Sequence, residues 1–198
     1  MKGKRSPWGT IQYAREIAAG IVLIDTAGHG GIKLDRTRNA AVPRPLRAEG
    51  GWYEEDCQEN IPHFFFYDEF TAYILQRGHC IPVEGRDAVE NHIKEWFPHE
   101  WMAWKGVTLD PSESHVLRRE KFEEETRGKY VARTTWGDWH EQVPEGYVGV
   151  YAVRKADGAA KWVLVKKNKF VVQDRRYACR EFFYVLDDDD VEWLQHPA

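Results

Sequence analysis

The sequence has little cysteine and no long apolar run. Its three cysteines, Cys57, Cys80 and Cys179, are far apart and form no CxxC pair. This pattern does not indicate a disulfide framework or a zinc finger, so we expect reduced, unpaired thiols, as in a cytoplasmic protein. No stretch approaches the apolar length of a membrane span, and no apolar signal-peptide core follows the basic residues 1–5.

A strong excess of charge is also missing. The formal net charge of −4 is small for a mimic of DNA and has the wrong sign for general nucleic-acid affinity, which needs clustered Lys and Arg. We therefore expect neither direct nucleic-acid binding nor a membrane partner. What the chain does have is nine tryptophans, and each ring needs either burial or a partner surface.

The hydrophobic periodicity changes along the chain from strands to helices and back to strands. Residues 11–17 and 21–24 predict a hairpin, and Asp35 is placed to cap a short helix that Pro43 ends. Later, the pair at residues 157–158 predicts a tight turn between two strands. This order indicates an α+β fold, a single domain over residues 1–198 with a largely antiparallel sheet and a central helical segment. One helix is expected to begin at Glu54, and two further helices are expected over residues 87–97 and 112–127. The expected later strands span 130–135, 147–154, 160–165 and 182–186.

The helix over residues 87–97 carries the broadest apolar stripe, through Val89, Ile93 and Trp96. We expect it to cover one face of the later sheet, because an antiparallel sheet with alternating apolar residues must bury one face. Residues 187–198 begin with four aspartates and are expected to form an acidic tail.

The stretch over residues 26–57 has the composition most typical of a functional site. It begins with His29 set among Gly28, Gly30 and Gly31. Glycines permit backbone angles closed to other residues, so His29 is expected on a tight, exposed loop. The stretch ends in an aromatic pair, three carboxylates and a thiol: Trp52, Tyr53, Glu54, Glu55, Asp56 and Cys57.

We expect this loop and the acidic run to lie together, with His29 within reach of Glu54, Glu55 or Asp56. An imidazole with carboxylates can bind a divalent metal or share acid–base chemistry. No HExxH, HxH or EF-hand spacing supports a metal, so no cofactor is predicted and a divalent metal stays an alternative. If the chain is an enzyme, His29 and Asp56 are its candidate catalytic residues. The plainer alternative is that His29 lies in a turn and the acids form a solvated helix start.

The remaining candidate groups have simpler alternatives too. Trp136, Asp138 and His140 lie in an aromatic loop that either completes a site or covers a sheet edge. Cys57 is a poor nucleophile, because adjacent carboxylates disfavour its thiolate. The basic run over residues 33–47 would hold a phosphate or an acidic partner, or be a solvated face.

Several words of the sequence together resemble an uncharacterised domain family of unknown function, encoded mainly by bacteriophages and other mobile elements. The words are SPWGTIQ, TAGHGGIKL, GWYEEDC, SHVLRREKFE and GDWH, and the resemblance spans about residues 6–186. It assigns no catalytic residue. Mobile-element proteins of this size often block or redirect a host system, so the resemblance implies a phage protein in the host cytoplasm.

Two functions from different classes follow. The first is a binding protein that inhibits or modulates a host defence system of the restriction or CRISPR type (an anti-CRISPR, for example), with a host protein or protein complex as its partner. The second is a small metal-dependent hydrolase or nucleotide-modifying enzyme centred on His29, Glu54, Glu55 and Asp56. We favour the binding protein and leave enzyme activity open. The candidate binding residues are Gly30, Gly31, Trp52, Tyr53, Glu54, Glu55, Trp136, Asp138 and His140.

Overall fold

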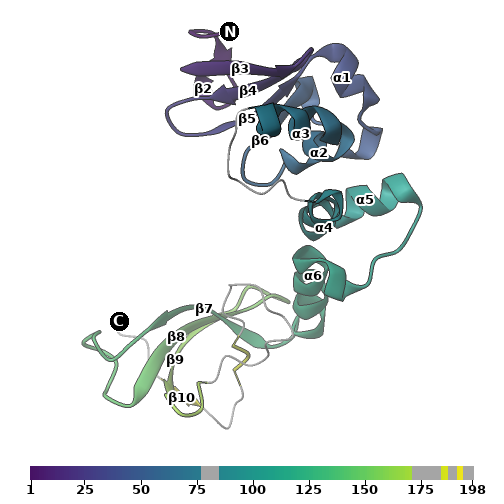
Figure 1. Cartoon of the computed structure of the whole chain (residues 1–198). Helices are drawn as coiled ribbons and strands as arrows, with labels where there is room; N and C mark the ends of the chain where they lie inside the picture. Colours follow the sequence, from purple (N-terminus) through teal and green to yellow (C-terminus); the bar gives the residue numbers. More distant parts are fainter. Residues whose placement is uncertain (77–84, 171–183, 187–190, 194–198) are drawn as a thin grey trace. The chain divides into compact units, whose positions relative to one another are not determined.

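Helices and antiparallel sheets are combined in this chain, which confirms the predicted α+β class (Figure 1). The chain divides into two compact units, Met1–Val116 and Leu117–Ala198. The expectation of a single domain stays a prediction. The computed structural model describes residues 1–76, 85–170, 184–186 and 191–193.

The first unit is built on a four-stranded antiparallel sheet. Its first two strands form the hairpin that the alternating pattern predicted, with Tyr13 opposite Asp25. A separate small ribbon, β1 (Arg5–Ser6) with β2 (Gly9–Thr10), precedes the sheet. The strands of the sheet, in spatial order, are β3 (Tyr13–Ala18), β4 (Ile21–Asp25), β5 (Gly30–Leu34) and β6 (Trp52–Glu54).

At strands β5 and β6, one face of this sheet is buried and the other is more open. Ile32 and Tyr53 lie opposite each other across the two strands and are almost fully buried. Because successive side chains of a strand point to opposite faces, Lys33, Trp52 and Glu54 belong to the other face. The candidate site lies there.

The segment between β5 and β6 begins with the short helix that the sequence predicted. Helix α1 (Arg36–Ala41) is capped by Asp35, whose carboxylate accepts the N–H of Arg38 at 2.7 Å. Within α1, Asn39 Oδ1 accepts a hydrogen bond of 2.6 Å from the hydroxyl of Tyr53, which ties the helix to β6. Two short 3-10 turns, η1 (Arg44–Leu46) and η2 (Glu49–Gly51), complete the connection.

The helix predicted to begin at Glu54 is wrong. Glu54 is the last residue of β6, and turns lead from it to α2 (Asn60–Phe65). The acids suited a helix N-terminus, but pairing with β5 satisfies the backbone of residues 52–54 first. Pro62 lies in the first turn of α2, where its missing N–H leaves no helical hydrogen bond unmade.

The helix predicted over residues 87–97 is present as α4 (Arg86–Trp96). Its buried residues, Val89 and Ile93, face neighbours in the first unit, where α4 contacts α2 and α5 (Pro98–Lys105). Helices of its own unit thus account for the buried part of its stripe, and its expected contact with the later sheet stays a prediction. Trp96, expected on that stripe, is 46% exposed. Helix α3 (Tyr67–Gln76), the turn η3 (Pro111–Glu113) and α6 (His115–Glu125) complete the helices, the last within the predicted 112–127.

The second unit contains another four-stranded antiparallel sheet, in the order β10–β9–β8–β7. The predicted turn at residues 157–158 is confirmed, with Gly158 at φ +72° and the Asp157 carboxylate accepting the N–H of Ala159. Of the predicted strand 182–186, residues 184–186 pair beside β7, and residues 182 and 183 lie outside the described part, as do the four aspartates. The strands are β7 (Tyr130–Trp136), β8 (Tyr147–Arg154), β9 (Ala160–Lys166) and β10 (Val191–Trp193). Among the helices described, none combines the length and the apolar character needed to cross a bilayer.

Candidate functional site

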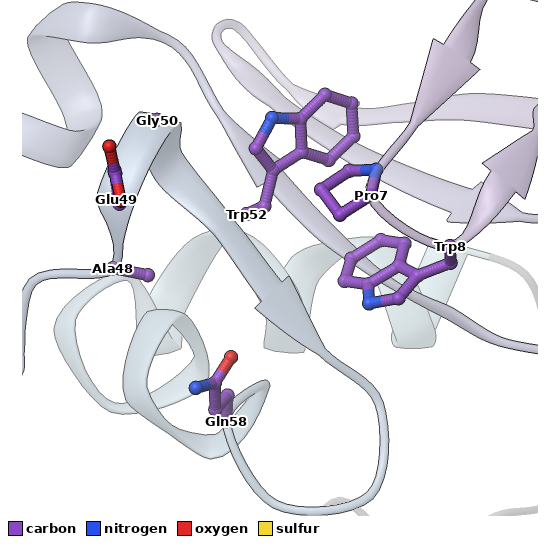
Figure 2. A pocket seen from close by; sticks show the side chains of 7 residues that line it. All are labelled: Pro7, Trp8, Ala48, Glu49, Gly50, Trp52 and Gln58. Atoms are coloured by element: carbon purple, nitrogen blue, oxygen red, sulfur yellow. The ribbon is translucent and has the colours of Figure 1, made fainter.

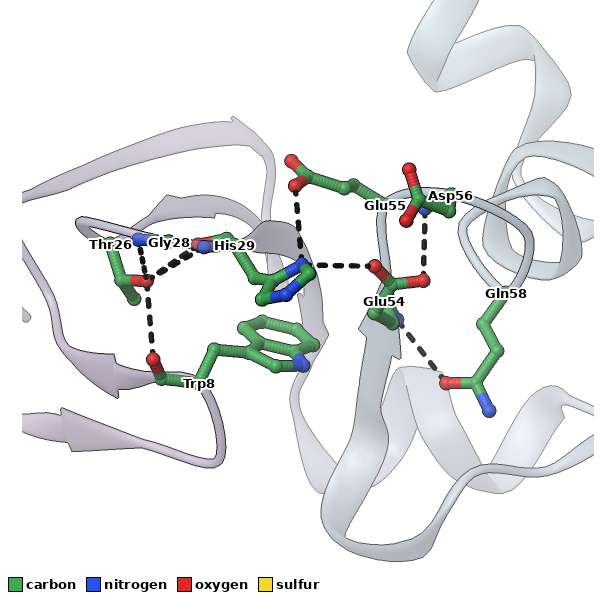
Figure 3. Close-up of polar contacts among 8 residues, drawn as sticks. All are labelled: Trp8, Thr26, Gly28, His29, Glu54, Glu55, Asp56 and Gln58. Carbon is green, nitrogen blue, oxygen red and sulfur yellow. Dashed lines mark hydrogen bonds and ion pairs between the residues drawn. The ribbon is translucent and has the colours of Figure 1, made fainter. Parts of the chain in front are cut away.

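His29 is held in a tight turn between β4 and β5 by the side chain of Thr26 (Figure 3). Thr26 Oγ1 accepts the N–H groups of His29 at 3.2 Å and Gly28 at 3.4 Å, and it donates to the His29 carbonyl at 2.7 Å. The N–H of Thr26 donates to the same carbonyl at 2.9 Å. The backbone of His29 is thus fixed, while its side chain stays 59% exposed.

Two of the three predicted acids converge on the His29 ring. Its Nδ1 lies 3.6 Å from Glu54 Oε1 and 3.8 Å from Glu55 Oε1 (Figure 3). One ligand atom from each of these three residues lies within 4.8 Å of the others. The predicted proximity is confirmed for Glu54 and Glu55. Asp56, the other candidate catalytic residue, is exposed and stands outside this group.

Glu54 and Glu55 are chain neighbours, yet both carboxylates reach one ring because β6 ends between them. The N–H of Glu54 donates to Gln58 Oε1 at 3.2 Å, and the N–H of Glu55 donates to the Gly30 carbonyl at 3.2 Å. Gly30 leaves room for the second carboxylate, since a Cβ there would stand 2.6 Å from Glu55 Oε2. A glycine beside the histidine therefore makes space for an acid.

Gly31 is needed for a different reason. Its φ is +152°, and a Cβ would collide with the carbonyl oxygen of Tyr53 and stand 2.6 Å from the ring of Trp8. The Tyr53 ring points into the core, and the indole over Gly31 belongs to Trp8 and not to Trp52.

Trp8 and Trp52 form one wall of an open cleft of about 470 Å³ (Figure 2). Their rings meet edge to face, with centroids 5.7 Å apart and planes at 87°. Lys33 Nζ lies 4.8 Å from the centroid of the Trp52 ring and donates to the Gly50 carbonyl. The other lining residues are Pro7, Ala48, Glu49, Gly50 and Gln58.

The cleft and the His29 group share their supports. Gln58 lines the cleft and also accepts the N–H of Glu54, and Trp52 and Glu54 lie on the same face of β6. Sequence reasoning missed Trp8 and Gln58. The signal for Trp8 was the word SPWGTIQ, which joins a turn to a tryptophan just before the first long strand.

Negative charge is crowded beside this cleft. Burial, followed by the neighbouring carboxylates of Glu55, Glu54 and Asp56, raises the pKa of Glu59 to about 7. A partly buried acid close to three others gains from losing its charge, or from a cation nearby.

A family model matches residues 1–127, and its description is a domain of unknown function (DUF7007). The chain belongs to this family. The DUF7007 match includes Trp8, the His29 loop and β6, so the whole of the site described above lies within it. No curated protein and no solved structure matches the chain.

Cys57 is a free cysteine next to the acids of the DUF7007 region. Burial and the carboxylates of Glu54 and Asp56 raise the pKa of its thiol. A raised pKa leaves less thiolate, which is unfavourable for a nucleophile. Cys80 and Cys179 lie outside the described residues.

The aromatic loop of Trp136, Asp138 and His140 lies in the second unit, beyond the DUF7007 match. Trp136 stacks on Trp162, with ring centroids 4.4 Å apart, and Asp138 forms an ion pair of 2.6 Å with Lys167. These contacts fix the loop on the end of its own sheet, as the simpler alternative describes. They give no sign of a ligand.

The basic run over residues 33–47 does not gather into a phosphate site. Arg38 pairs with Glu69 at 2.7 Å, and Arg47 donates to the carbonyl of Val42. Because Lys33 is held at Trp52, three of these cations already have partners inside the first unit.

Proposed function

We propose that the chain acts by binding, through the exposed face of β5 and β6. This β5–β6 face consists of the cleft and the acids beside it: Trp8, Glu49, Trp52, Glu54, Glu55 and Gln58. The observation that carries the proposal is the open cleft walled by two perpendicular indoles. Tryptophans placed in this way bury a large area against a partner and lose little conformational freedom in doing so.

The charge of the β5–β6 face favours a partner with basic side chains. Within the described residues, Glu54 and Glu55 have only His29 as an ion-pair partner, and Glu49 has none. Acids at the rim of an aromatic cleft that have no Lys or Arg partner speed the encounter with a basic surface and disfavour an acidic one. Lys33, held at the Gly50 carbonyl and the Trp52 ring, brings one positive charge against the three carboxylates of Glu49, Glu54 and Glu55, so the face keeps a net negative charge.

The partner class we propose is a host protein or protein complex in the cytoplasm, as for a modulator of restriction or CRISPR defence. This part of the proposal comes from the resemblance to phage and mobile-element proteins. The structure contributes the surface, its aromatic wall and its charge.

Affinity capture from lysates of candidate host cells tests the binding function. The test variant is Glu49→Lys, at the cleft, and its matched control is Glu16→Lys, an exposed acid on β3 at the far edge of the same sheet. We expect wild type and Glu16→Lys to capture the same protein, and Glu49→Lys to capture about tenfold less, equal to about 1.4 kcal/mol. Equal capture by both variants would exclude the β5–β6 face.

A second candidate is a small metal-dependent hydrolase or nucleotide-modifying enzyme. It is favoured by one observation, the approach of Glu54 and Glu55 to His29 Nδ1. A metal held there would activate a water molecule, and the adjacent indoles offer a stacking surface for a base. Hydrolysis of nucleotides and phosphodiesters in the presence of Mn²⁺, abolished by Glu54→Gln, would favour this enzyme over the binding protein.

A further inference from the structure

We propose that His29, Glu54 and Glu55 form a binding site for one divalent transition-metal ion, for which Zn²⁺ is the best match. The proposal goes beyond the binding function and does not depend on it. The two indoles and Glu49 would remain available to a partner with or without the metal, although the enzyme candidate requires it.

The spacing of the three side chains suits a single metal ion. Zinc binds imidazole nitrogen and carboxylate oxygen at about 2.0–2.2 Å, so a tetrahedral site separates neighbouring ligand atoms by about 3.4 Å. His29 Nδ1 already lies 3.6 Å from Glu54 Oε1 and 3.8 Å from Glu55 Oε1. Side-chain rotations would close the remaining few tenths of an ångström to His29 Nδ1 and would bring the oxygens of Glu54 and Glu55, which lie within 4.8 Å of each other, to the same separation.

Each ligand is positioned by contacts that leave its binding atom free. Thr26 fixes the backbone of His29, and the exposed ring keeps Nδ1 directed at the acids (Figure 3). Glu54 Oε2 accepts the N–H of Asp56 at 2.9 Å, so its other oxygen faces the ring. Such outer contacts hold metal ligands ready and are typical of binding sites.

Gly30 supplies a second, independent feature. The carboxylate of Glu55 occupies the space in which a Cβ at residue 30 would lie, 2.6 Å from Oε2, and the N–H of Glu55 is anchored on the Gly30 carbonyl. The glycine therefore allows the second acid to approach the ring. An ordinary strand end would send two consecutive acids to opposite faces.

The donor set selects the kind of metal. Ca²⁺ and Mg²⁺ prefer oxygen ligands alone, whereas one imidazole with two carboxylates suits Zn²⁺ and other first-row ions. The three side chains are 59%, 23% and 42% exposed, which leaves room for water at the metal. We therefore expect an open site with a Kd of about 1–10 μM, equal to about 7–8 kcal/mol of binding.

Calorimetric titration of the full chain with ZnCl₂ tests the site, with MgCl₂ in a parallel titration. The test variants are His29→Ala and Glu55→Gln, and the matched control is Asp56→Asn, an adjacent acid outside the group. We expect one zinc site in wild type and in Asp56→Asn, at least tenfold weaker binding in both test variants, and no comparable affinity for Mg²⁺. Circular dichroism without metal verifies that all variants are folded.

Two outcomes would overturn the proposal: the same zinc affinity in His29→Ala as in wild type, or no zinc binding by the wild type at 1 mM. Titration with Co²⁺ gives a readout at the metal itself, because its visible absorption reports the nitrogen and oxygen ligands, and His29→Ala should remove that spectrum. Neither of these outcomes would change how much host protein the Glu49→Lys variant captures. The zinc proposal and the binding proposal can therefore fail independently of each other.

Discussion

At the scale of single residues, the first unit holds two partly buried ionisable groups whose protonation affects its stability. Burial lowers the pKa of His63 to about 4. The centroids of the His63 and Phe70 rings are 4.0 Å apart. Glu59 has a pKa of about 7, raised by burial and by the nearby acids. The folded state therefore disfavours a proton on His63 and favours one on Glu59, so the two residues respond to acid with opposite sign.

His63 predicts a loss of stability on acidification. The pKa of His63 is about 6.5 in the unfolded state and about 4 in the folded state. Between these values the unfolded state binds more protons, so the free energy of unfolding decreases as the pH is lowered. Between pH 7.5 and pH 5 this contribution amounts to about 2 kcal/mol. Urea unfolding should show that His63→Gln loses about 2 kcal/mol less than wild type over this range. The comparison cancels the opposite contribution of Glu59, and an equal loss in both proteins would contradict the buried neutral histidine.

At the scale of elements, local signals in the sequence predicted what depends on local interactions. The β3–β4 hairpin, the cap of α1 at Asp35 and the turn at residues 157–158 each follow from a few adjacent residues, and the structure confirms them. A helix was predicted to begin at Glu54, which in fact ends β6, because the partner strand β5 lies about 20 residues earlier and no local pattern reveals such pairing. Local preference for acids at a helix start is weak, about 1 kcal/mol or less, and the ladder outweighs it.

In the candidate site, too, some features could be predicted from local sequence and others could not. The approach of His29 to the acids was predictable, because a glycine turn and an acidic run are both visible in the sequence. Trp8 was not, since its position over Gly31 depends on how the β1–β2 ribbon returns to β5. The stripe of α4 was recognised, but which apolar surface would cover it depends on the fold as a whole.

The pairing of β5 with β6 predicts a sharp difference between two glycines of the same loop. Gly31→Val would place a branched side chain at φ +152°, against the Trp8 ring and the Tyr53 carbonyl, whereas Gly28 has nothing within 4 Å of a Cβ. We expect Gly31→Val to lower the free energy of unfolding by about 3 kcal/mol or more, and Gly28→Val by less than about 1 kcal/mol. Urea unfolding of the two variants measures this, and equal losses would contradict the close approach of Trp8.

At the scale of the whole molecule, the features that suggest function are gathered in one of the two compact units. The DUF7007 match ends at residue 127, shortly after the first unit ends at Val116, and it contains both the cleft and the His29 group. The aromatic loop of the second unit is fixed by contacts of its own, although Trp139 is 75% exposed and offers a rival contact surface. We therefore expect the partner to bind to the first unit.

Site-specific photo-cross-linking in host cells tests that placement most directly. A photoreactive amino acid replaces either Glu49, at the cleft, or Trp139, the exposed aromatic residue of the second unit, in the full chain. The account predicts that the protein captured by wild type is cross-linked from position 49 and not from position 139. Cross-linking of that protein from position 139 alone, or equally from both positions, would contradict binding through the β5–β6 face.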